Sequence, residues 1–269
     1  MTAVTDTVGS DKVGKGLARA ISDTAVMTKR NLLKYLRIPT LLLFSTIQPV
    51  MFVLLFVFVF GGAVQFGGTT NYATFLLPGI FAQTAIFGST NTGIGLAEDI
   101  NKGIIERFKS LPMAQSAVLL GRTLSDAVRN TFVVILMTVV GYIVGFRFQG
   151  SLGQAVAALL LAVLFGFAFS WISAWIGLTV RDVETAQAAG FIWVFPLTFA
   201  SSAFVPTETM PSWLQGFADI NPVTTAVNTL RALTFGESPT PDLWWMLAWI
   251  AGILGVFVPL AVRQYKKAV

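Results

Sequence analysis

The sequence predicts an all-α integral membrane protein with six transmembrane helices. Five long blocks of the chain carry no charged side chain, and the first block, residues 38–97, is long enough for two helices around a glycine-rich turn at 61–69. A helix needs about 20 apolar residues to cross a bilayer. Hydrophobic residues make up 55% of the chain and charged residues only 12%. We therefore expect spans at about 41–60, 72–97, 117–146, 152–180, 186–205 and 243–262.

The basic residues indicate how these spans are oriented. Lys and Arg that flank transmembrane helices stay preferentially on the cytoplasmic side. Of the 18 basic residues, only Arg147 and Arg231 fall on the other side in the six-span scheme. Both termini, including the tail 263–269, are therefore expected in the cytoplasm. We expect the protein to lie in a bacterial plasma membrane. The net charge of +5 follows from this asymmetry and gives no reason to expect a nucleic-acid partner.

Two residue types that are missing from the chain exclude most membrane enzymes. The chain has no histidine and no cysteine, which removes thiolate nucleophiles, Ser-His-Asp triads and the usual zinc, haem and iron–sulfur sites. The 13 acidic residues lie at span ends and in loops, so a carboxylate site at bilayer depth is not expected. We expect no catalytic residue and no metal site, and we interpret the chain as a transport subunit and not an enzyme.

One run near the N-terminus partly matches an ATP-binding motif. Residues 9–15, GSDKVGK, fit the first seven positions of a phosphate-binding P-loop, but Gly16 stands where a magnesium-binding Ser or Thr is required. No apolar strand precedes the run, as such a motif demands. We therefore expect no cofactor in this chain, and ATP and magnesium must bind to another subunit if they are used.

The segment before the first span, residues 17–37, is predicted to be an amphipathic helix. At 100° per residue, one stripe carries charged side chains and the opposite stripe mainly apolar ones. The charged stripe consists of Arg19, Asp23, Arg30, Lys34 and Arg37, and the opposite stripe of Leu17, Ile21, Ala25, Thr28, Leu32 and Tyr35. Such a helix lies in the membrane interface with its basic face toward anionic lipid headgroups. Residues 1–16 are polar and contain glycine, so we expect them to be disordered.

The loop between the second and third spans, residues 98–113, is predicted to contain a short helix. Its sequence, EDINKGIIERFKSLPM, places apolar side chains on one helical face and charged side chains on the other. The apolar face consists of Ile100, Ile104, Phe108 and Leu111, and the charged face of Asp99, Lys102, Glu106 and Lys109. A short amphipathic helix that ends at a proline is suited to docking on a soluble partner. The alternative is a helix that lies on the membrane surface.

This loop also carries the most specific resemblance to a known family. Residues 103–112, GIIERFKSLP, resemble the G-x-x-E-R-x-x-x-x-P segment of type-2 ABC-exporter permeases. The resemblance implies two ATP-binding cassette subunits, which hold ATP and magnesium, and a second copy or close relative of the permease. It also implies that the segment is the coupling helix that sits on the ATPase subunit, with the residues Gly103, Ile104, Glu106, Arg107, Phe108 and Pro112.

Further segments resemble the same family in the same order along the chain. Residues 77–79, LPG, open the second span as in that family, and residues 181–190 look like its link between spans four and five. Residues 204–214, FVPTETMPSWL, and 221–224, NPVT, are similar to the stretch between spans five and six in its daunorubicin-resistance branch. Thr225 stands where that branch often has an aromatic residue, which is a mild departure.

The stretch between spans five and six, residues 205–242, is predicted to be a re-entrant segment on the outer face. It holds five prolines and two apolar pieces, 213–217 and 223–235, that are too short to span a bilayer. Backbone of this kind at membrane depth often lines a pathway. In the resembling family it forms the outer gate, which implies that role for Pro206, Glu208, Pro211, Trp213, Asn221, Pro222 and Arg231. A lid that never contacts substrate is the alternative.

Charged residues are expected to form a network at the cytoplasmic edge of the third span. Arg122, Asp126 and Arg129 are spaced by four and three residues, so they share one helical face. Charges near bilayer depth are costly unless they are paired or hydrated. Glu98 and Asp99, at the end of the second span, are candidate partners for Arg122 or Arg129. We interpret this network as structural in preference to a substrate site.

Spans four and five are rich in large rings that offer broad apolar surfaces to a hydrophobic drug or lipid. Contact with membrane lipids explains the same rings equally well. The candidate substrate contacts are Phe165, Phe169, Trp171, Trp175, Phe191 and Trp193.

Together these observations favour the permease subunit of an ATP-driven exporter for a hydrophobic or amphipathic drug or lipid. A type-2 permease for a lipid-linked saccharide or another cell-envelope lipid shares the same expected fold and is the nearer alternative. An ATP-independent channel or membrane enzyme is more distant, because the chain lacks histidine and intramembrane carboxylates.

Overall fold

The predicted all-α fold is confirmed for the residues that the structure describes. The computed structural model describes residues 8–60, 72–110, 115–238 and 241–267, which form helices but no strand. The turn expected at 61–69 and Pro112 lie outside these ranges. The helices are α1 (Val8–Arg37), α2 (Pro39–Leu55), α3 (Tyr72–Asn101), α4 (Ile104–Lys109), α5 (Gln115–Ile143), α6 (Leu152–Val180), α7 (Val183–Phe199), α8 (Ser212–Ile220), α9 (Pro222–Phe235) and α10 (Pro241–Lys267). A π-helical turn, Phe56–Phe60, continues α2.

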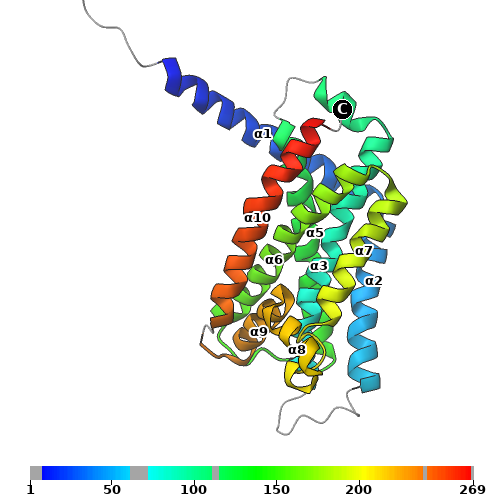
Figure 1. Ribbon diagram of the computed structural model, residues 1–269, viewed down its shortest axis with the longest axis vertical. Coiled ribbons are helices and arrows are strands. Elements are labelled where there is room, and N and C mark those ends of the chain that lie inside the picture. The colour runs from blue at the N-terminus through cyan, green and yellow to red at the C-terminus, as the bar shows by residue number, and fades with distance from the viewer. Residues whose placement is uncertain (1–7, 61–71, 111–114, 239–240, 268–269) are drawn as a thin grey trace, which may run out of the picture.

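The long helices stand side by side in a bundle (Figure 1). Helices α8 and α9 lie at one end, which we call the α9 end. Helix α4 and the C-terminal part of α10 lie at the other, which we call the α4 end, and α1 crosses that end at a slant. The described parts of the two chain ends therefore lie on the same side of the bundle.

Five helices of the described chain are long and apolar enough to cross a membrane. They contain the segments Leu42–Val59, Tyr72–Asn101, Ser116–Ile143, Leu152–Val180 and Pro241–Lys267. Each coincides with one of the expected spans to within a few residues, except that α10 continues five residues past 262. Long, mainly apolar sequence produces these helices, as the length of a bilayer core requires, although α5 also carries Arg122, Asp126 and Arg129.

The remaining expected span, 186–205, is shorter in the structure than the sequence suggested. Helix α7 begins at Val183 and ends after 17 residues at Phe199. Two features favour this early end. Pro196 has no backbone N–H and so removes one helical hydrogen bond near the end of α7. In addition, the Asn221 side chain donates to the carbonyl oxygens of Leu197 and Ala200, both at 2.8 Å. These bonds satisfy carbonyl groups that a helix end would otherwise leave without a partner.

Helix α1 is longer than the predicted amphipathic segment. It begins at Val8, so residues 8–16, which we expected to be disordered, are helical instead. No proline interrupts residues 8–37, and extending an existing helix costs far less than starting one. The helix stops at Arg37 because Pro39 disfavours a helical conformation at Ile38, whose φ is −124° and ψ 76°.

Helix α3 forms the centre of the bundle. It packs against α5, α6, α7 and α9, and most of its side chains are buried. Its contact with α6 is so close that a Cβ atom added to Gly177 would overlap the backbone of Gly93. Helices inside membranes associate largely through such close packing of small residues. Helix α2, by contrast, stands at the edge of the bundle with most of its apolar side chains exposed.

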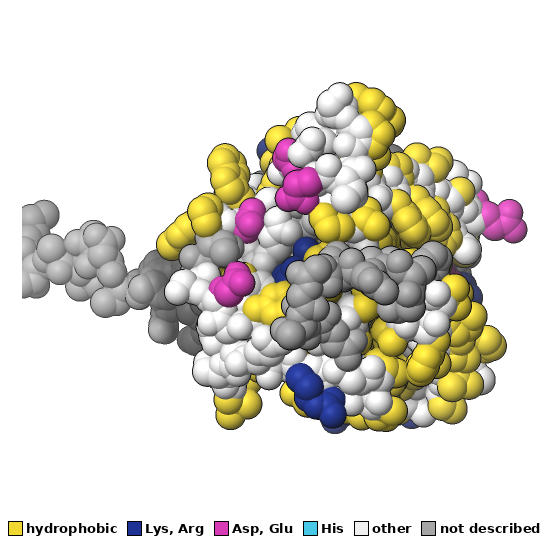
Figure 2. Space-filling view, turned by 90° about the horizontal axis from the view of Figure 1, so that it is seen from below, with side chains coloured by type: hydrophobic (Ala, Val, Ile, Leu, Met, Phe, Trp, Pro, Cys, Tyr) yellow, Lys and Arg dark blue, Asp and Glu magenta, His cyan; other side chains and the backbone are white. Residues whose placement is uncertain are grey.

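The segment predicted to be re-entrant folds into two short helices at the α9 end. Helix α9 has only 14 residues, yet most of them are buried against α3, α6 and α10. Pro222 starts it, and Gly236, with φ of +80°, ends it in a conformation that favours glycine. Helix α8 is mostly exposed. Figure 2 views this end, where acidic side chains are more evident than basic ones.

Candidate functional site

Helix α4 presents a charged surface at one end of the bundle. Gly103, with φ of +65°, turns the chain sharply from α3 into α4. Within α4, the side chain of Ile105 is buried, while Glu106 and Arg107 are exposed. The Phe108 ring lies under the guanidinium group of Arg30 in α1. The exposed charges of α4 therefore remain available for contact with another molecule.

Helix α4 is held against α1 by a cation–π contact. The guanidinium carbon of Arg30 in α1 lies 4.7 Å from the centre of the Phe108 ring. Ile105 joins Met27 of α1 and Leu96 of α3 in one buried apolar cluster. The sequence pattern placed Ile104 and Phe108 on the apolar face but did not identify Ile105, because the bend at Gly103 changes which side of α4 faces the bundle. Movement of α4 is thus tied physically to α1 and α3.

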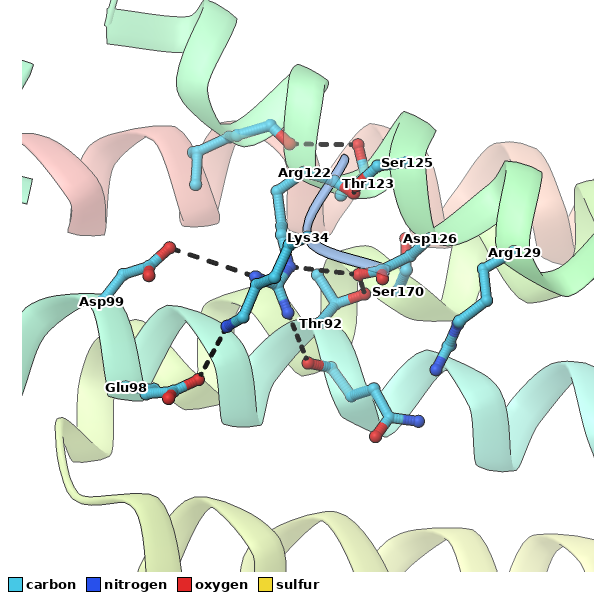
Figure 3. A network of polar contacts seen from close by, with 12 residues as sticks. Lys34, Thr92, Glu98, Asp99, Arg122, Thr123, Ser125, Asp126, Arg129 and Ser170 are labelled. Carbon is cyan, nitrogen blue, oxygen red and sulfur yellow. Dashed lines mark hydrogen bonds and ion pairs between the residues drawn. The ribbon is translucent and has the colours of Figure 1, made fainter. Parts of the chain in front are cut away.

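The predicted charge network lies buried where α3 meets α5 (Figure 3). The Nε atom of Arg122 lies 3.4 Å from Oδ2 of Asp126, one turn later in α5. Its Nη1 atom lies 4.0 Å from Oδ2 of Asp99 in α3. Both Arg122 and Asp126 are more than nine-tenths buried, so each charge depends on the other for stabilisation.

Helix α1 contributes a residue to this network that the sequence pattern did not identify. The hydroxyl group of Tyr35 donates to Oδ1 of Asp126 at 2.6 Å, and Thr92 of α3 donates to Oδ2 at 2.6 Å. Burial and then the charge of Asp126 raise the pKa of Tyr35 above its usual range, so Tyr35 remains a protonated donor. Tyr35 was placed on the apolar stripe of α1, where its ring indeed faces the protein.

The two acids at the end of α3 have different partners. Asp99 forms an ion pair with Arg122. Glu98, which we expected beside Arg122 or Arg129, instead contacts Lys34 of α1 at 3.2 Å and Lys102 at 2.5 Å. The reason is position: Glu98 is half-buried at the rim, where flexible lysine side chains reach it, whereas Asp99 faces into the bundle. Helix α1 is thus joined to α3 by an ion pair.

Arg129 is buried without a carboxylate partner among the described residues. Its Nη2 atom donates to the Gly88 carbonyl oxygen at 2.7 Å and to Oδ1 of Asn130 at 3.3 Å. Its Nε atom is buried and has no acceptor in the described part of the chain. Its guanidinium carbon lies 5.8 Å from the centre of the Tyr35 ring.

One glycine makes room for the network. A Cβ atom added to Gly95 in α3 would overlap the guanidinium group of Arg122. The absence of a side chain here lets Arg122 cross α3 and donate to the Asn91 carbonyl oxygen at 3.2 Å. The path of Arg122 therefore depends on glycine at this position.

A cavity of about 380 Å³ adjoins these charges, bounded by α1, α2, α3, α5 and α7. Its volume is in the range typical of small-molecule sites, about 300–1,000 Å³. Charged lining comes from Lys34, Glu98, Arg122 and Arg129. Aromatic lining comes from Phe44, Phe52, Phe87 and Phe191, with Tyr35. Side-chain amides complete the wall, namely Asn31, Gln48, Gln83, Asn91, Asn130 and Gln187.

These amides are the site residues that sequence reasoning missed. Gln48, Gln83, Asn130 and Gln187 lie within charge-free blocks, where an amide is costly unless it is hydrogen-bonded. The cost of an unpaired amide at membrane depth was the sequence signal that could have identified these residues. It became informative only when the fold brought four separate helices together around one space.

Most aromatic residues proposed as substrate contacts lie elsewhere. Phe165, Phe169 and Trp171 of α6 are almost completely buried inside the bundle. Phe169 stacks on Trp193 with ring centres 5.7 Å apart, and Trp175 packs edge-on against Phe257. Of the six candidates, only Phe191 lines the cavity.

The residues expected at the outer gate separate into buried and exposed groups. Asn221 and Pro222 are buried where α8 joins α9, and Asn221 also accepts from the Val223 backbone at 2.8 Å. Arg231 lies 3.8 Å from the centre of the Phe75 ring and donates to the carbonyl oxygens of Phe75 and Ser202. Burial lowers the pKa of Arg231 to about 10, so it stays charged near neutral pH. Glu208, Pro211 and Trp213 are exposed, and Pro206 is partly exposed.

Within the described ranges, no group of three or more potential ligand side chains is arranged to hold a metal ion. The described chain instead combines the exposed charges of α4 with a charged cavity lined by α1, α2, α3, α5 and α7.

Comparison with known proteins agrees with these features. Residues 22–235 match the model of a family described as ABC-2 type transporter. The chain is 37% identical to the daunorubicin resistance ABC transporter permease protein DrrB1 of Streptomyces coeruleorubidus, over 94% of this chain and 90% of that protein. It is 26% identical to the "Probable doxorubicin resistance ABC transporter permease protein DrrC" of Mycobacterium tuberculosis (strain CDC 1551 / Oshkosh), over 92% of this chain and 90% of that protein.

The family match covers most of the chain, including α2 to α9, and the relatives align over nearly its full length. With long apolar helices throughout, the protein is a membrane-embedded permease. The chain belongs to the ABC-2 type transporter family.

Proposed function

We propose that this chain is the transmembrane subunit of an ATP-driven exporter that moves a hydrophobic or amphipathic compound out of a bacterial cell. Two separate ATP-binding cassette subunits hold ATP and magnesium, and a second permease copy or close relative completes the complex. Both termini and the α4 end face the cytoplasm. This orientation is supported by the basic residues, which concentrate at the α4 end.

The observation that carries this proposal is the surface of α4. Glu106 and Arg107 point their charges outward, while Ile105 and Phe108 attach the same helix to α1 and α3. A helix with a fixed inner face and a charged outer face is suited to bind an ATPase and to move with it when the ATPase changes conformation. The ion pairs of α3 with α1 and α5 then provide a route by which movement of α4 is transmitted to the bundle.

Helix α7 serves as the sixth span in this proposal. Its 17 residues measure about 25 Å, slightly less than a bilayer core of about 30 Å. The turn that follows it and the buried helix α9 cover the remaining depth at the α9 end. Helices α8 and α9 form the outer gate, and Arg231 anchors that gate to α3 through Phe75.

ATP-dependent accumulation in inverted membrane vesicles tests the transport activity. The permease, co-expressed with an ATP-binding subunit, is given a fluorescent anthracycline or a fluorescent fatty-acid analogue. We expect accumulation of at least one compound with ATP and none with a non-hydrolysable analogue. Equal accumulation under both conditions would contradict ATP-driven export.

A further inference from the structure

The cations that line the cavity are paired unequally. Arg122 is neutralised by Asp126 and Asp99, and Lys34 lies 3.2 Å from Glu98. Arg129 also lines the cavity, yet it has no ion pair among the described residues. The three cations therefore equal in number the three acids Asp99, Asp126 and Glu98, but within the described ranges these acids form ion pairs with Arg122 and Lys34 and none with Arg129.

Asp126, the acid nearest to Arg129 in sequence, is already fully engaged. Its Oδ1 atom accepts from Tyr35, and its Oδ2 atom accepts from Thr92 and Arg122. Rotation of Asp126 toward Arg129 would break these bonds. The network thus holds both oxygens of Asp126 on other donors, so Asp126 acts on Arg129 through its charge alone and forms neither an ion pair nor a hydrogen bond with it.

Arg129 is also incompletely hydrogen-bonded. Only 5% of its surface is exposed, and its buried Nε atom has no acceptor among the described residues. A buried cation with an unused donor is costly, and such groups at membrane depth commonly mark a binding site. An arginine offers a planar pair of donors that fits a carboxylate or phosphate.

The rest of the cavity suits the body of an amphipathic molecule. Phe44, Phe52, Phe87 and Phe191 provide apolar surface, and side-chain amides such as Gln83 provide donors and acceptors between the rings. An anionic group beside Arg129 would leave its apolar body against these rings. A cationic group in the same place would be repelled.

We propose that Arg129 is the anion-recognising residue of a binding site for amphipathic compounds that carry a phosphate or carboxylate. This inference rests on the proposed function, because it names the substrate class of the exporter. The same anionic chemistry can come from an exported compound or from a resident anionic phospholipid, and the experiment below separates these sources.

Binding of two matched amphiphiles tests the proposal. The full-length permease in phosphatidylcholine nanodiscs is titrated with photoreactive dodecyl phosphate or with dodecyl trimethylammonium bearing the same photoreactive tail. We expect the phosphate to label the wild type with at least about tenfold higher affinity than the ammonium compound, and to label α3 or α5 peptides. Equal affinity for the two head groups, or labelling only outside the cavity, would overturn the proposal.

Substitutions show whether Arg129 causes the preference. Arg129→Gln is expected to lower the affinity for dodecyl phosphate about tenfold, whereas Arg129→Lys retains most of it. Arg263→Gln removes an exposed positive charge at the same end of the bundle and is the matched control. If Arg129→Gln binds as tightly as the control, the proposal is wrong. If Arg129→Gln does not fold, the head-group preference and the labelled peptides of the wild type still decide.

Nanodiscs that also contain phosphatidylglycerol separate the two sources. Weaker labelling by dodecyl phosphate as phosphatidylglycerol increases indicates a resident lipid in the site, and unchanged labelling indicates an exported compound. Both results keep Arg129 as the anion-recognising residue. Because this assay needs no ATPase, it can fail while ATP-driven transport succeeds, and the reverse also holds.

Discussion

The Tyr35 hydroxyl group donates a 2.6 Å hydrogen bond to the buried carboxylate of Asp126. This bond joins α1, which crosses the α4 end of the bundle, to the charge network inside it. Together with the ion pair between Lys34 and Glu98, it makes α1 part of the wall of the cavity. Helix α1, which we expected to lie in the membrane interface, therefore also has a structural role in the bundle.

Removing the Tyr35 hydroxyl should destabilise the protein. Tyr35→Phe leaves the buried Asp126 carboxylate without one of its donors, which costs about 1–3 kcal/mol. We expect a lower thermal unfolding temperature in detergent, measured by tryptophan fluorescence. Tyr142→Phe, at a half-exposed ring in α5, is the control and should change little. Equal effects of the two substitutions would argue against the role of the Tyr35 bond.

Adding one methyl group to Gly95 should disturb the network. The new Cβ atom of Gly95→Ala would overlap the Arg122 guanidinium group, and overpacking of this kind costs about 1–3 kcal/mol. Gly252→Ala in α10 is the matched control, because nothing lies within 4 Å of its new Cβ atom. The control should be neutral or slightly stabilising, since alanine favours helices. Thermal unfolding of both variants checks this contrast, and similar stability would contradict it.

Asn221 should be important for the stability of the α9 end. Its side chain donates to two carbonyl oxygens at the end of α7 and accepts from the start of α9. Asn221→Ala leaves these buried groups unpaired, which should cost about 3 kcal/mol or more. Limited proteolysis should then cut the 200–220 segment faster. Asn101→Ala, at an exposed position, is the control, and equal proteolysis of both variants would refute the expectation.

The start of α7 should weaken in acid. Asp182 accepts from the Thr185 hydroxyl and backbone at 2.7 and 2.8 Å, and these bonds hold the pKa of Asp182 below its usual value. The folded state therefore gains stability from Asp182 above the ordinary pKa of about 4 and loses it as the pH falls further. Asp182→Asn keeps the capping group but cannot titrate. Its unfolding temperature should depend less on pH than that of the wild type between about pH 2 and pH 5. Identical pH profiles would contradict this assignment.

The long helices could be predicted because their signal is local. A long, mainly apolar stretch with few charged side chains forms a helix largely from its local sequence, and five of the six expected spans coincide with helices long enough to cross a membrane. The end of α7 could not be predicted this way. It depends on Asn221, which lies more than 20 residues later and reaches the α7 carbonyl groups only in the folded protein.

The candidate site was only partly predictable for the same reason. The spacing of Arg122, Asp126 and Arg129 placed all three on one helical face, and the structure places all three near the cavity, with Arg122 and Arg129 lining it. Their partners come from other helices, however, and Tyr35, Thr92 and Lys34 cannot be paired with them from local patterns. The structure buries Phe165, Phe169 and Trp171 of α6 inside the bundle, which the sequence could not show, because an apolar ring looks the same in sequence whether it faces lipid, ligand or protein.

The most direct test of the account is the ATPase activity of this permease purified with its ATP-binding subunit, with Glu106 and Arg107 replaced by alanine. Glu184→Ala and Arg263→Ala, at exposed charges of the same end, are the matched controls. If α4 receives the ATPase, the Glu106→Ala and Arg107→Ala variants should lose the bound ATPase or the stimulation of its activity by transported compound, while both controls retain them. A permease that purifies alone, or α4 variants that behave like the controls, would contradict the central claim.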